Sequence, residues 1–230
     1  MEASRATSQI PMDKISHSIP EILIDRLPVT LNQVLAQLPQ EILAQVEEIR
    51  LRQDRPLMVR CHCREYFVNY RGISEDSDRA YRVTSEDVQK TVQVLTGSSL
   101  YACEEELRQG YITIAGGHRV GLSGSVVVRD SRVDTIREIG SLNIRLAREF
   151  PGTAMSLLPR LLDSRTREVM HTILVSPPRC GKTTLLRDLV RLLSNGVPEL
   201  GLPGKTVGVV DERSEIAGSY LGVPQLDVGI

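Results

Sequence analysis

The 230-residue sequence has no tryptophan and only two phenylalanines, so aromatic side chains cannot build its core. Leucine, valine and isoleucine must do so, and a composition of 41% apolar and 25% charged residues is that of a soluble globular chain. No apolar run approaches the roughly 20 residues that a membrane-spanning helix needs. The four cysteines are too few for a disulfide framework, which favours reduced thiols in a cytosol.

A large excess of positive charge is also missing. The chain has 28 basic and 29 acidic residues and a formal net charge of −1, which argues against a protein that coats a polyanion. The shortage of aromatic side chains for base stacking points the same way, so nucleic acid is not an expected partner. Only four of the basic residues are lysines, and one of them, Lys182, lies in the most informative motif of the sequence.

Residues 20–150 are predicted to form an α+β domain. One helix is expected behind a possible N-cap at Thr30, and Thr84-Ser85-Glu86-Asp87 has the form of a capping box that opens another. Alternating apolar and polar residues predict strands between positions 47 and 68. Two apolar runs separated by Gly116-Gly117 predict a hairpin with a glycine turn.

The pattern changes near residue 150. Residues 1–19 are expected to be a flexible N-terminus, and residues 151–230 a partial P-loop ATPase domain. Within this last part, an apolar strand (172–176), a helix (181–193) and a second strand (206–210) follow one another. Such alternation is typical of a βαβ unit, so we predict an α/β fold with a parallel sheet. A sheet of this kind needs further strands, so the domain is expected to be incomplete at its C-terminus.

The segment between the strand at 172–176 and the helix has the residue pattern of a phosphate-binding loop. Gly181 would let the backbone approach a phosphate, Lys182 would reach the β- and γ-phosphates, and the Thr183 hydroxyl would hold Mg²⁺. Ser176 stands where the full pattern has glycine. The predicted cofactor-binding residues are Ser176, Pro177, Pro178, Arg179, Cys180, Gly181, Lys182, Thr183 and Thr184.

Two other interpretations of the loop are open. Its Gly-Lys-Thr-Thr could be an accidental helix start with a capping residue, which the strand before it and the helix after it argue against. Cys180 lies inside the loop and could be a low-pKa thiol beside a helix N-terminus, although a small filler fits the position better.

Acidic residues follow the strand predicted at 206–210. Asp211, Glu212 and Glu215 are candidate catalytic residues that would orient water or face the γ-phosphate, and Asp211 is also a candidate magnesium ligand. The alternative is a solvated acidic turn in which Asp211 pairs with Arg213. Since only 29 positions separate Lys182 from Asp211, these carboxylates could also precede a later Walker B strand.

Five separated segments share one likeness: EEIRLRQDRPLMVR, GGHRVGLSG, REIGSLNIRLARE, SPPRCGKTTLLRDLVR and VGVVDERSEIAGSYLGVPQLDVGI. Together they resemble the stage III sporulation protein AA family, from about residue 31 to residue 230. The resemblance implies an ATPase related to the motors of type II and type IV secretion, with a RecA-like P-loop domain. It places Gly181, Lys182, Thr183 and Thr184 in the nucleotide loop, and Asp211, Glu212 and Glu215 in an acidic box before Walker B.

The same resemblance implies cofactors, partners and a location. The cofactors would be ATP and Mg²⁺, and the protein would form a homo-oligomer, expected to be a hexameric ring. It would work with membrane components of a channel to the forespore, from the cytoplasm of the mother cell and without inserting into the membrane. Family members run further than this chain, to a Walker B segment, so we expect this chain to turn over ATP only feebly.

Further hypotheses rest on weaker signals. Arginines at 119, 137, 145 and 148 could act as arginine fingers across a subunit boundary, although solvated strand ends fit any single one better. A P-loop nucleic-acid-binding protein, with nucleotide as a switch, is the alternative function, and a small-molecule kinase is a weaker third. Cys61-His62-Cys63 does not have the spacing of a zinc site.

Overall fold

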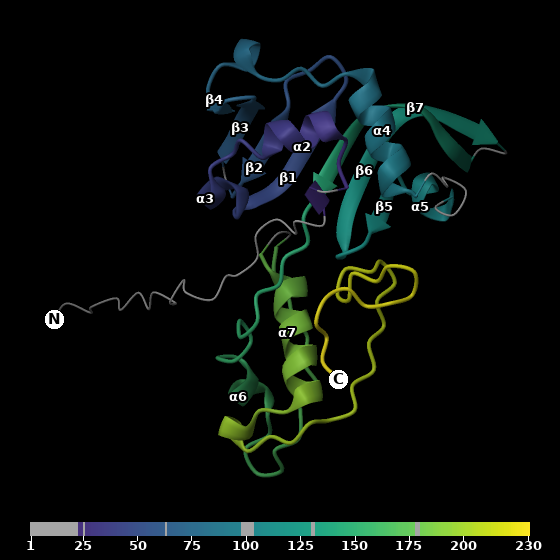
Figure 1. Cartoon of the computed structure of the whole chain (residues 1–230). Coiled ribbons are helices and arrows are strands. Elements are labelled where there is room, and N and C mark those ends of the chain that lie inside the picture. Colours follow the sequence, from purple (N-terminus) through teal and green to yellow (C-terminus); the bar gives the residue numbers. More distant parts are fainter. Residues whose placement is uncertain (1–22, 25, 63, 98–103, 130–131, 178–179) are drawn as a thin grey trace.

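The computed structural model describes residues 23–24, 26–62, 64–97, 104–129, 132–177 and 180–230. Figure 1 shows two parts joined end to end: a sheet with helices against it, formed by the chain up to about residue 146, and a second part built around one long helix. The helices are α2 (Val29–Leu35), α3 (Gln40–Leu43), α4 (Ser85–Leu95), α5 (Glu104–Arg108), α6 (Leu158–Leu161) and α7 (Lys182–Asn195), with 3-10 turns at Ser77–Arg79 and Pro198–Leu200.

A seven-stranded sheet dominates the first part, and every neighbouring pair in it is antiparallel. Its order is β4-β3-β2-β1-β7-β6-β5, so the hairpin β6–β7 closes against β1 in the middle of the sheet. The strands are β1 (Val46–Arg52), β2 (Met58–Cys61), β3 (Arg64–Asn69), β4 (Gly72–Ser74), β5 (Tyr111–Ile114), β6 (His118–Arg129) and β7 (Arg132–Arg145).

The predicted fold class is wrong. An α/β fold with a parallel, RecA-like P-loop sheet in residues 151–230 is not what the chain forms, since its sheet is antiparallel and all seven strands lie before residue 146. The segments 172–176 and 206–210 belong to no helix and no sheet in the described residues. Apolar side chains within them face solvent, and Ile173 is 86% and Val210 96% exposed. A strand needs a neighbour for its backbone hydrogen bonds, and an apolar run alone does not supply one.

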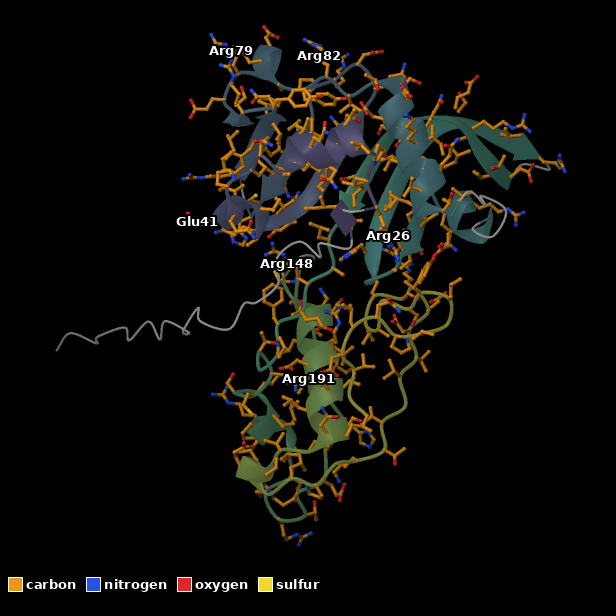
Figure 2. All side chains as sticks on the ribbon, in the orientation of Figure 1. Arg26, Glu41, Arg79, Arg82, Arg148 and Arg191 are labelled. Atoms are coloured by element: carbon orange, nitrogen blue, oxygen red, sulfur yellow. The ribbon has the colours of Figure 1, made fainter. Side chains whose placement is uncertain are left out.

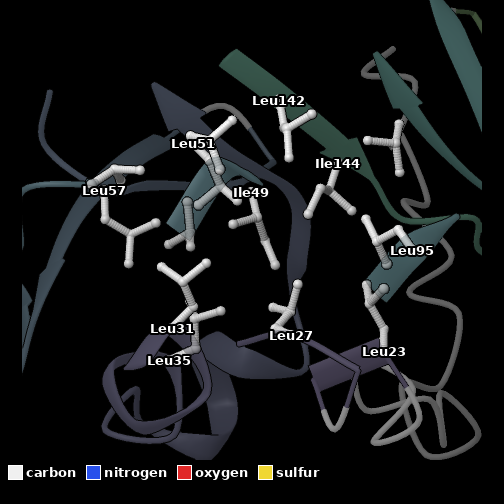
Figure 3. Packing of buried hydrophobic residues seen from close by; sticks show 14 of the residues in the cluster. Leu23, Leu27, Leu31, Leu35, Ile49, Leu51, Leu57, Leu95, Leu142 and Ile144 are labelled. Carbon is white, nitrogen blue, oxygen red and sulfur yellow. The ribbon is translucent and has the colours of Figure 1, made fainter. Parts of the chain in front are cut away.

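Helices α2 and α4 cover one face of the sheet. The main apolar core lies between these helices and the sheet (Figure 3). Alternation along the strands puts Ile49 and Leu51 of β1 and Ile144 of β7 on this face, and all three are fully or almost fully buried. Leu31 and Leu35 of α2 meet them from the helix side. The core is therefore aliphatic, as the lack of aromatic residues requires.

The opposite face of the sheet is polar. Register places Glu48 of β1 between Arg60 of β2 and Arg145 of β7, and Arg145 in turn beside Arg119 of β6. Glu48 is 3% exposed in its side chain and is bonded to Arg50. Burial by itself would raise the pKa of Glu48, but the surrounding arginines hold that pKa below its usual range. This row of charges leads along the sheet toward the second part of the molecule.

The predicted capping box is confirmed. The Thr84 hydroxyl accepts from the Asp87 N–H, and the Asp87 carboxylate accepts from the Thr84 N–H, so α4 begins as the sequence indicates. The predicted N-cap at Thr30 is wrong, because Pro28 is the N-cap of α2. The Thr30 hydroxyl donates instead to Asp87, at 2.7 Å, and the Tyr81 hydroxyl does the same at 2.7 Å. One buried carboxylate thus links α2, α4 and the segment just before α4.

The second part has an apolar cluster of its own, formed where α6 and the 3-10 turn pack against α7. A buried carboxylate also ties the chain to this helix: the Ala154 N–H donates to Asp188 of α7, at 2.8 Å. The domain boundary expected near residue 150 stays a prediction. The buried members of the cluster are Ala154, Leu158, Leu161, Leu162, Leu189, Leu192, Val197 and Leu202.

Candidate functional site

Helix α7 starts immediately after a glycine in a left-handed conformation. Gly181 has φ 78° and ψ 15°, and no side chain caps the helix. A residue with a Cβ adopts this conformation at a cost, so the position favours glycine. The Gly181 carbonyl accepts from Leu185, at 2.9 Å, and the helix then runs for 14 residues. Its first-turn N–H groups face outward with the positive end of the helix dipole, an arrangement that binds anions.

The Lys182 ammonium lies over the start of the loop. Its Nζ donates to the Ser176 carbonyl at 2.8 Å and to the Pro177 carbonyl at 3.0 Å, and lies 3.4 Å from the Ser176 hydroxyl. The residue standing where the pattern has glycine is therefore close to the lysine. Pro178 and Arg179, which complete the predicted loop, lie outside the described residues.

A hollow of about 470 Å³ opens beside this loop. Ser176, Cys180, Gly181, Lys182 and Thr184 are among the residues that line it, so the structure brings together predicted loop residues from both sides of the undescribed pair. The volume is within the range of small-molecule sites. Thr183 points to a different hollow, of about 280 Å³, on the side of α7 that faces the sheet.

The acidic residues are arranged as a turn. The Asp211 carboxylate accepts from the backbone N–H groups of Glu215, Ile216 and Ala217, each at 2.9 Å. Three of its lone-pair positions are thus in use, and the carboxylate shapes the chain around it. The smaller hollow is lined by Thr183 and Glu215 but, among the described residues, by neither Asp211 nor Glu212. The metal and catalytic roles of these carboxylates stay predictions.

The arginines singled out in the sequence lie in different places. Arg119 and Arg145 line the smaller hollow together with Thr183. Arg148 instead donates to the Ala44 carbonyl, just before β1, at 2.7 Å and to the Val46 carbonyl, at the start of β1, at 3.0 Å. It lies where the two parts of the molecule meet (Figure 2). Arg137 is exposed on the distal half of β7.

Arg119 connects the sheet to the acidic turn. Its guanidinium lies 3.9 Å from the centre of the Tyr111 ring and donates to the Arg213 carbonyl at 3.0 Å. It is also 3.9 Å from a Glu215 carboxylate oxygen. The carboxylate predicted to face a γ-phosphate is therefore paired, loosely, with a sheet arginine.

Arg187 and Asp188 of α7 are two further site residues, which sequence reasoning missed. Arg187 donates to the Glu215 carbonyl at 2.8 Å and also to the Ile216 carbonyl, and burial lowers the pKa of this guanidinium. Asp188 accepts from the Ala154 N–H and, at 2.9 and 2.7 Å, from Arg191. The helix thus holds the acidic turn on one side and the chain near residue 154 on the other. The sequence did carry one signal for these roles: Arg187 and Asp188 are adjacent charged residues among the apolar residues of α7.

His118, at the start of β6, is buried below the hairpin turn. The residue is 2% exposed, and burial lowers the pKa of its imidazole to about 4. Its Nδ1 accepts from the Ala147 N–H at 3.0 Å, so the ring is neutral with its proton on Nε2. A Cβ on Gly116 would lie 2.7 Å from Nε2, which explains glycine in the turn.

This histidine predicts a loss of stability in acid. The folded-state pKa of about 4 is below the ordinary value of 6.5, so the unfolded chain takes up the proton first as the pH falls. The stability that the neutral ring provides is complete above pH 6.5 and is lost between pH 6.5 and 4, with about 2 kcal/mol gone at pH 5. Denaturant unfolding at pH 7 and pH 5 should show this loss in the native chain.

A neutral replacement separates His118 from other titrating groups. His118→Gln should remove about 2 kcal/mol of the difference in stability between the two pH values. His171→Gln, at an exposed histidine, is the matched control and should leave the difference unchanged. If His118→Gln unfolds with the native pH dependence, burial of this ring is not its source.

Among the residues that the structure describes, none of the helices combines the length and apolar character that crossing a bilayer requires. The same residues contain no group of three or more His, Cys, Asp or Glu side chains placed to hold a metal ion. A magnesium ion bound with a nucleotide takes most of its ligands from phosphate and water, so a site with few protein ligands is compatible with it.

Fold and site together define a class: an antiparallel-sheet protein whose second part begins its main helix with Gly-Lys-Thr. Residues 18–230 match the family described as "Sporulation stage III, protein AA", and the chain belongs to that family. It is 41% identical over 203 residues to Stage III sporulation protein AA of Bacillus subtilis (strain 168). The alignment covers 88% of this chain and 61% of that relative, so the chain spans less than two thirds of the relative's length. No solved structure matches it.

Membership of this family confirms the resemblance noted in the sequence and gives the chain a place among sporulation proteins. The finer assignment to secretion-type motor ATPases stays a prediction. The parallel RecA-like sheet that the resemblance implied is the part of the expectation that the antiparallel fold contradicts.

Proposed function

We propose that the chain binds Mg-ATP, with the phosphates at the N-terminus of α7. The observation that carries this proposal is that a left-handed Gly181, a helix start without a side-chain cap and Lys182 together line a hollow of about 470 Å³. Backbone N–H groups and the helix dipole would bind the β-phosphate, and Lys182 would leave its two carbonyl acceptors for phosphate oxygens.

Magnesium would be held by the Thr183 hydroxyl, which lies on the adjacent position of α7 and lines the hollow shared with Glu215, Arg119 and Arg145. Glu215 is the acidic residue best placed to meet the ion or a water bound to it. Asp211 would support the ion indirectly, since its carboxylate holds the backbone of the turn that carries Glu215.

Titration of the chain with a fluorescent ATP analogue tests the proposal. We expect saturable binding that unlabelled ATP displaces and that Mg²⁺ strengthens. A labelled oligonucleotide in the same buffer tests the alternative, a nucleic-acid-binding protein, whose affinity would fall steeply with salt. Binding of the oligonucleotide without ATP binding would contradict the proposal and favour the alternative.

We further propose that ATP binding serves a motor in sporulation, in which hexameric rings work with membrane components of a channel from the mother cell to the forespore. Family membership supports the setting, and the Arg119 contact between sheet and acidic turn offers a route from nucleotide to the first part of the chain. Sedimentation with and without Mg-ATP checks the ring, and a monomer under both conditions at high concentration would contradict it.

A further inference from the structure

We infer that the distal half of the hairpin β6–β7 docks into a hollow between α2 and α4 of a second copy of this chain, in a head-to-tail contact. The inference deepens the proposed function, because it rests on the proposed ring and names the two surfaces that would form it. The nucleotide loop takes no part in it. A contact of this kind joins two different surfaces of one chain, and its repetition closes a ring when the rotation between neighbours allows.

The hairpin extends beyond the strands on either side of it. Among the described residues, β5 pairs with β6 only as far as Gly121, and β1 pairs with β7 only as far as Ser141. Strands β6 and β7 pair with each other well beyond these points. We call this projecting part, residues 123–129 and 133–139, the arm (Figure 1). A two-stranded ribbon is marginally stable by itself, so the arm gains stability from packing against a partner.

One face of the arm is aliphatic and open to solvent. Val126 and Val128 are two residues apart on β6, so their side chains share a face, and Val133 lies opposite Val128 on β7. Val126 is 52% exposed and Val128 is 62% exposed. None of the six residues from Ser123 to Val128 is charged or proline, so this strand lacks the side chains that ordinarily keep an exposed edge from joining another chain. The arm therefore has the properties of a contact surface that the chain by itself leaves uncovered.

The charges of the arm favour a protein partner over a polyanion. Its two basic residues, Arg129 and Arg137, are balanced by two acidic ones, Asp134 and Glu138. Arg129 is also paired with Asp134, at 3.6 Å, and Glu138 accepts from the Ser125 hydroxyl, at 2.8 Å. An anionic lipid surface or a nucleic acid would require an excess of positive charge beside the valines. The partner surface that fits is apolar, with balanced charges around it.

The chain itself carries such a surface, between the start of α2 and α4. A hollow of about 470 Å³ lies there, and Val29 and Val94 are among the described residues that line it. Val29 is 71% exposed and Val94 is 46% exposed, so this apolar rim is uncovered as well. Two basic and two acidic residues also line the hollow, and one pair of them, Lys90 and Glu86, is bonded at 2.7 Å. Arm and hollow thus match in apolar character and in the balance of their charges.

The walls of the hollow are held in place without a partner. Asp87 of α4 accepts from the Thr30 hydroxyl of α2 and from the Tyr81 hydroxyl, each at 2.7 Å, and all three residues line the hollow. Because this carboxylate ties α2 to α4, docking would cost little conformational freedom on the side of the hollow. In Figure 1 the arm extends away from α2 and beyond α4, so an arm that fills the hollow comes from another copy.

Cysteine cross-linking of the full chain tests the contact. Val128→Cys on the arm and Val94→Cys at the hollow are prepared separately, and a short thiol-specific cross-linker is added to each variant alone and to their mixture. We expect a cross-linked dimer in the mixture that is at least about tenfold more abundant than in either variant alone or in the unsubstituted chain, which controls for the native cysteines. A dimer that forms equally well with Val128→Cys alone would place arm against arm and overturn the inference.

Sedimentation of the full chain over a range of concentrations is the second measurement. Val126→Glu combined with Val128→Glu should weaken self-association at least about tenfold, because the contact would bury two unpaired carboxylates. Val223→Glu, at a similarly exposed valine of the second part, is the matched control and should leave self-association unchanged. Thermal unfolding and titration with the fluorescent ATP analogue should give native values for both variants, which shows that they are folded and separates this test from the nucleotide site.

The outcomes distinguish the arm contact from the ring. A native chain that stays monomeric at high concentration, with and without Mg-ATP, contradicts both together. An oligomer that forms as well with the glutamate variant of the arm as with the native chain overturns the arm contact and leaves the ring standing. Flotation of the native chain with phosphatidylglycerol vesicles, lost in the same variant, would assign the arm to a lipid surface and overturn the inference as well.

Discussion

Lys182→Ala is expected to lower the affinity of the chain for ATP by at least about 100-fold. Lys182 supplies the only lysine charge at the loop, and hydrogen bonds between an ammonium and phosphate oxygens are among the stronger polar interactions in proteins. A loss of two such bonds accounts for a change of this size, since about 1.4 kcal/mol corresponds to each factor of ten. Titration with the fluorescent ATP analogue measures it directly.

The rest of the fold should tolerate this substitution. Among the described residues, the ammonium bonds to the Ser176 and Pro177 carbonyls and the Ser176 hydroxyl, which are close to solvent, so we expect little change in thermal unfolding. Lys205→Ala is the matched control, because it removes the other lysine of the second part, which is paired with Glu168 at 2.7 Å. Lys182→Ala with native ATP affinity would contradict the phosphate site and everything proposed for it.

Local signals in the sequence predicted local structure well. Thr84 and Asp87 are three residues apart and satisfy each other's backbone, so their pattern determines a helix start without help from distant residues. Gly116-Gly117 likewise lies in a turn whose two residues both have positive φ, and the hairpin β5–β6 forms there. The helix after Lys182 follows from its apolar spacing and from the glycine before it.

Sheet topology could not be predicted in the same way. The segment 172–176 has the composition of a buried strand, yet it pairs with no strand in the described chain. Whether such a segment joins a sheet depends on which other segments reach it, and composition does not record that. The likeness to a βαβ unit therefore identified the loop and the helix but gave the wrong sheet.

Roles of charged residues were the other limit. Asp211 has the position of a metal ligand in the sequence, but its carboxylate is taken up by three backbone N–H groups of the turn that follows. Arg187 and Asp188 look like solvated helix positions, and both are bonded to chain segments about 30 residues away. A sequence shows which groups are available, whereas their partners depend on how distant segments approach.

Asp188→Ala is expected to destabilise the chain by about 4 kcal/mol, the cost of removing one partner from a buried pair. Asp188 is 4% exposed, and its loss leaves both the Ala154 N–H and the Arg191 guanidinium without their acceptor. Chemical denaturation monitored by circular dichroism measures the change. Glu199→Ala removes an exposed carboxylate of the same part and should alter stability by less than about 0.5 kcal/mol.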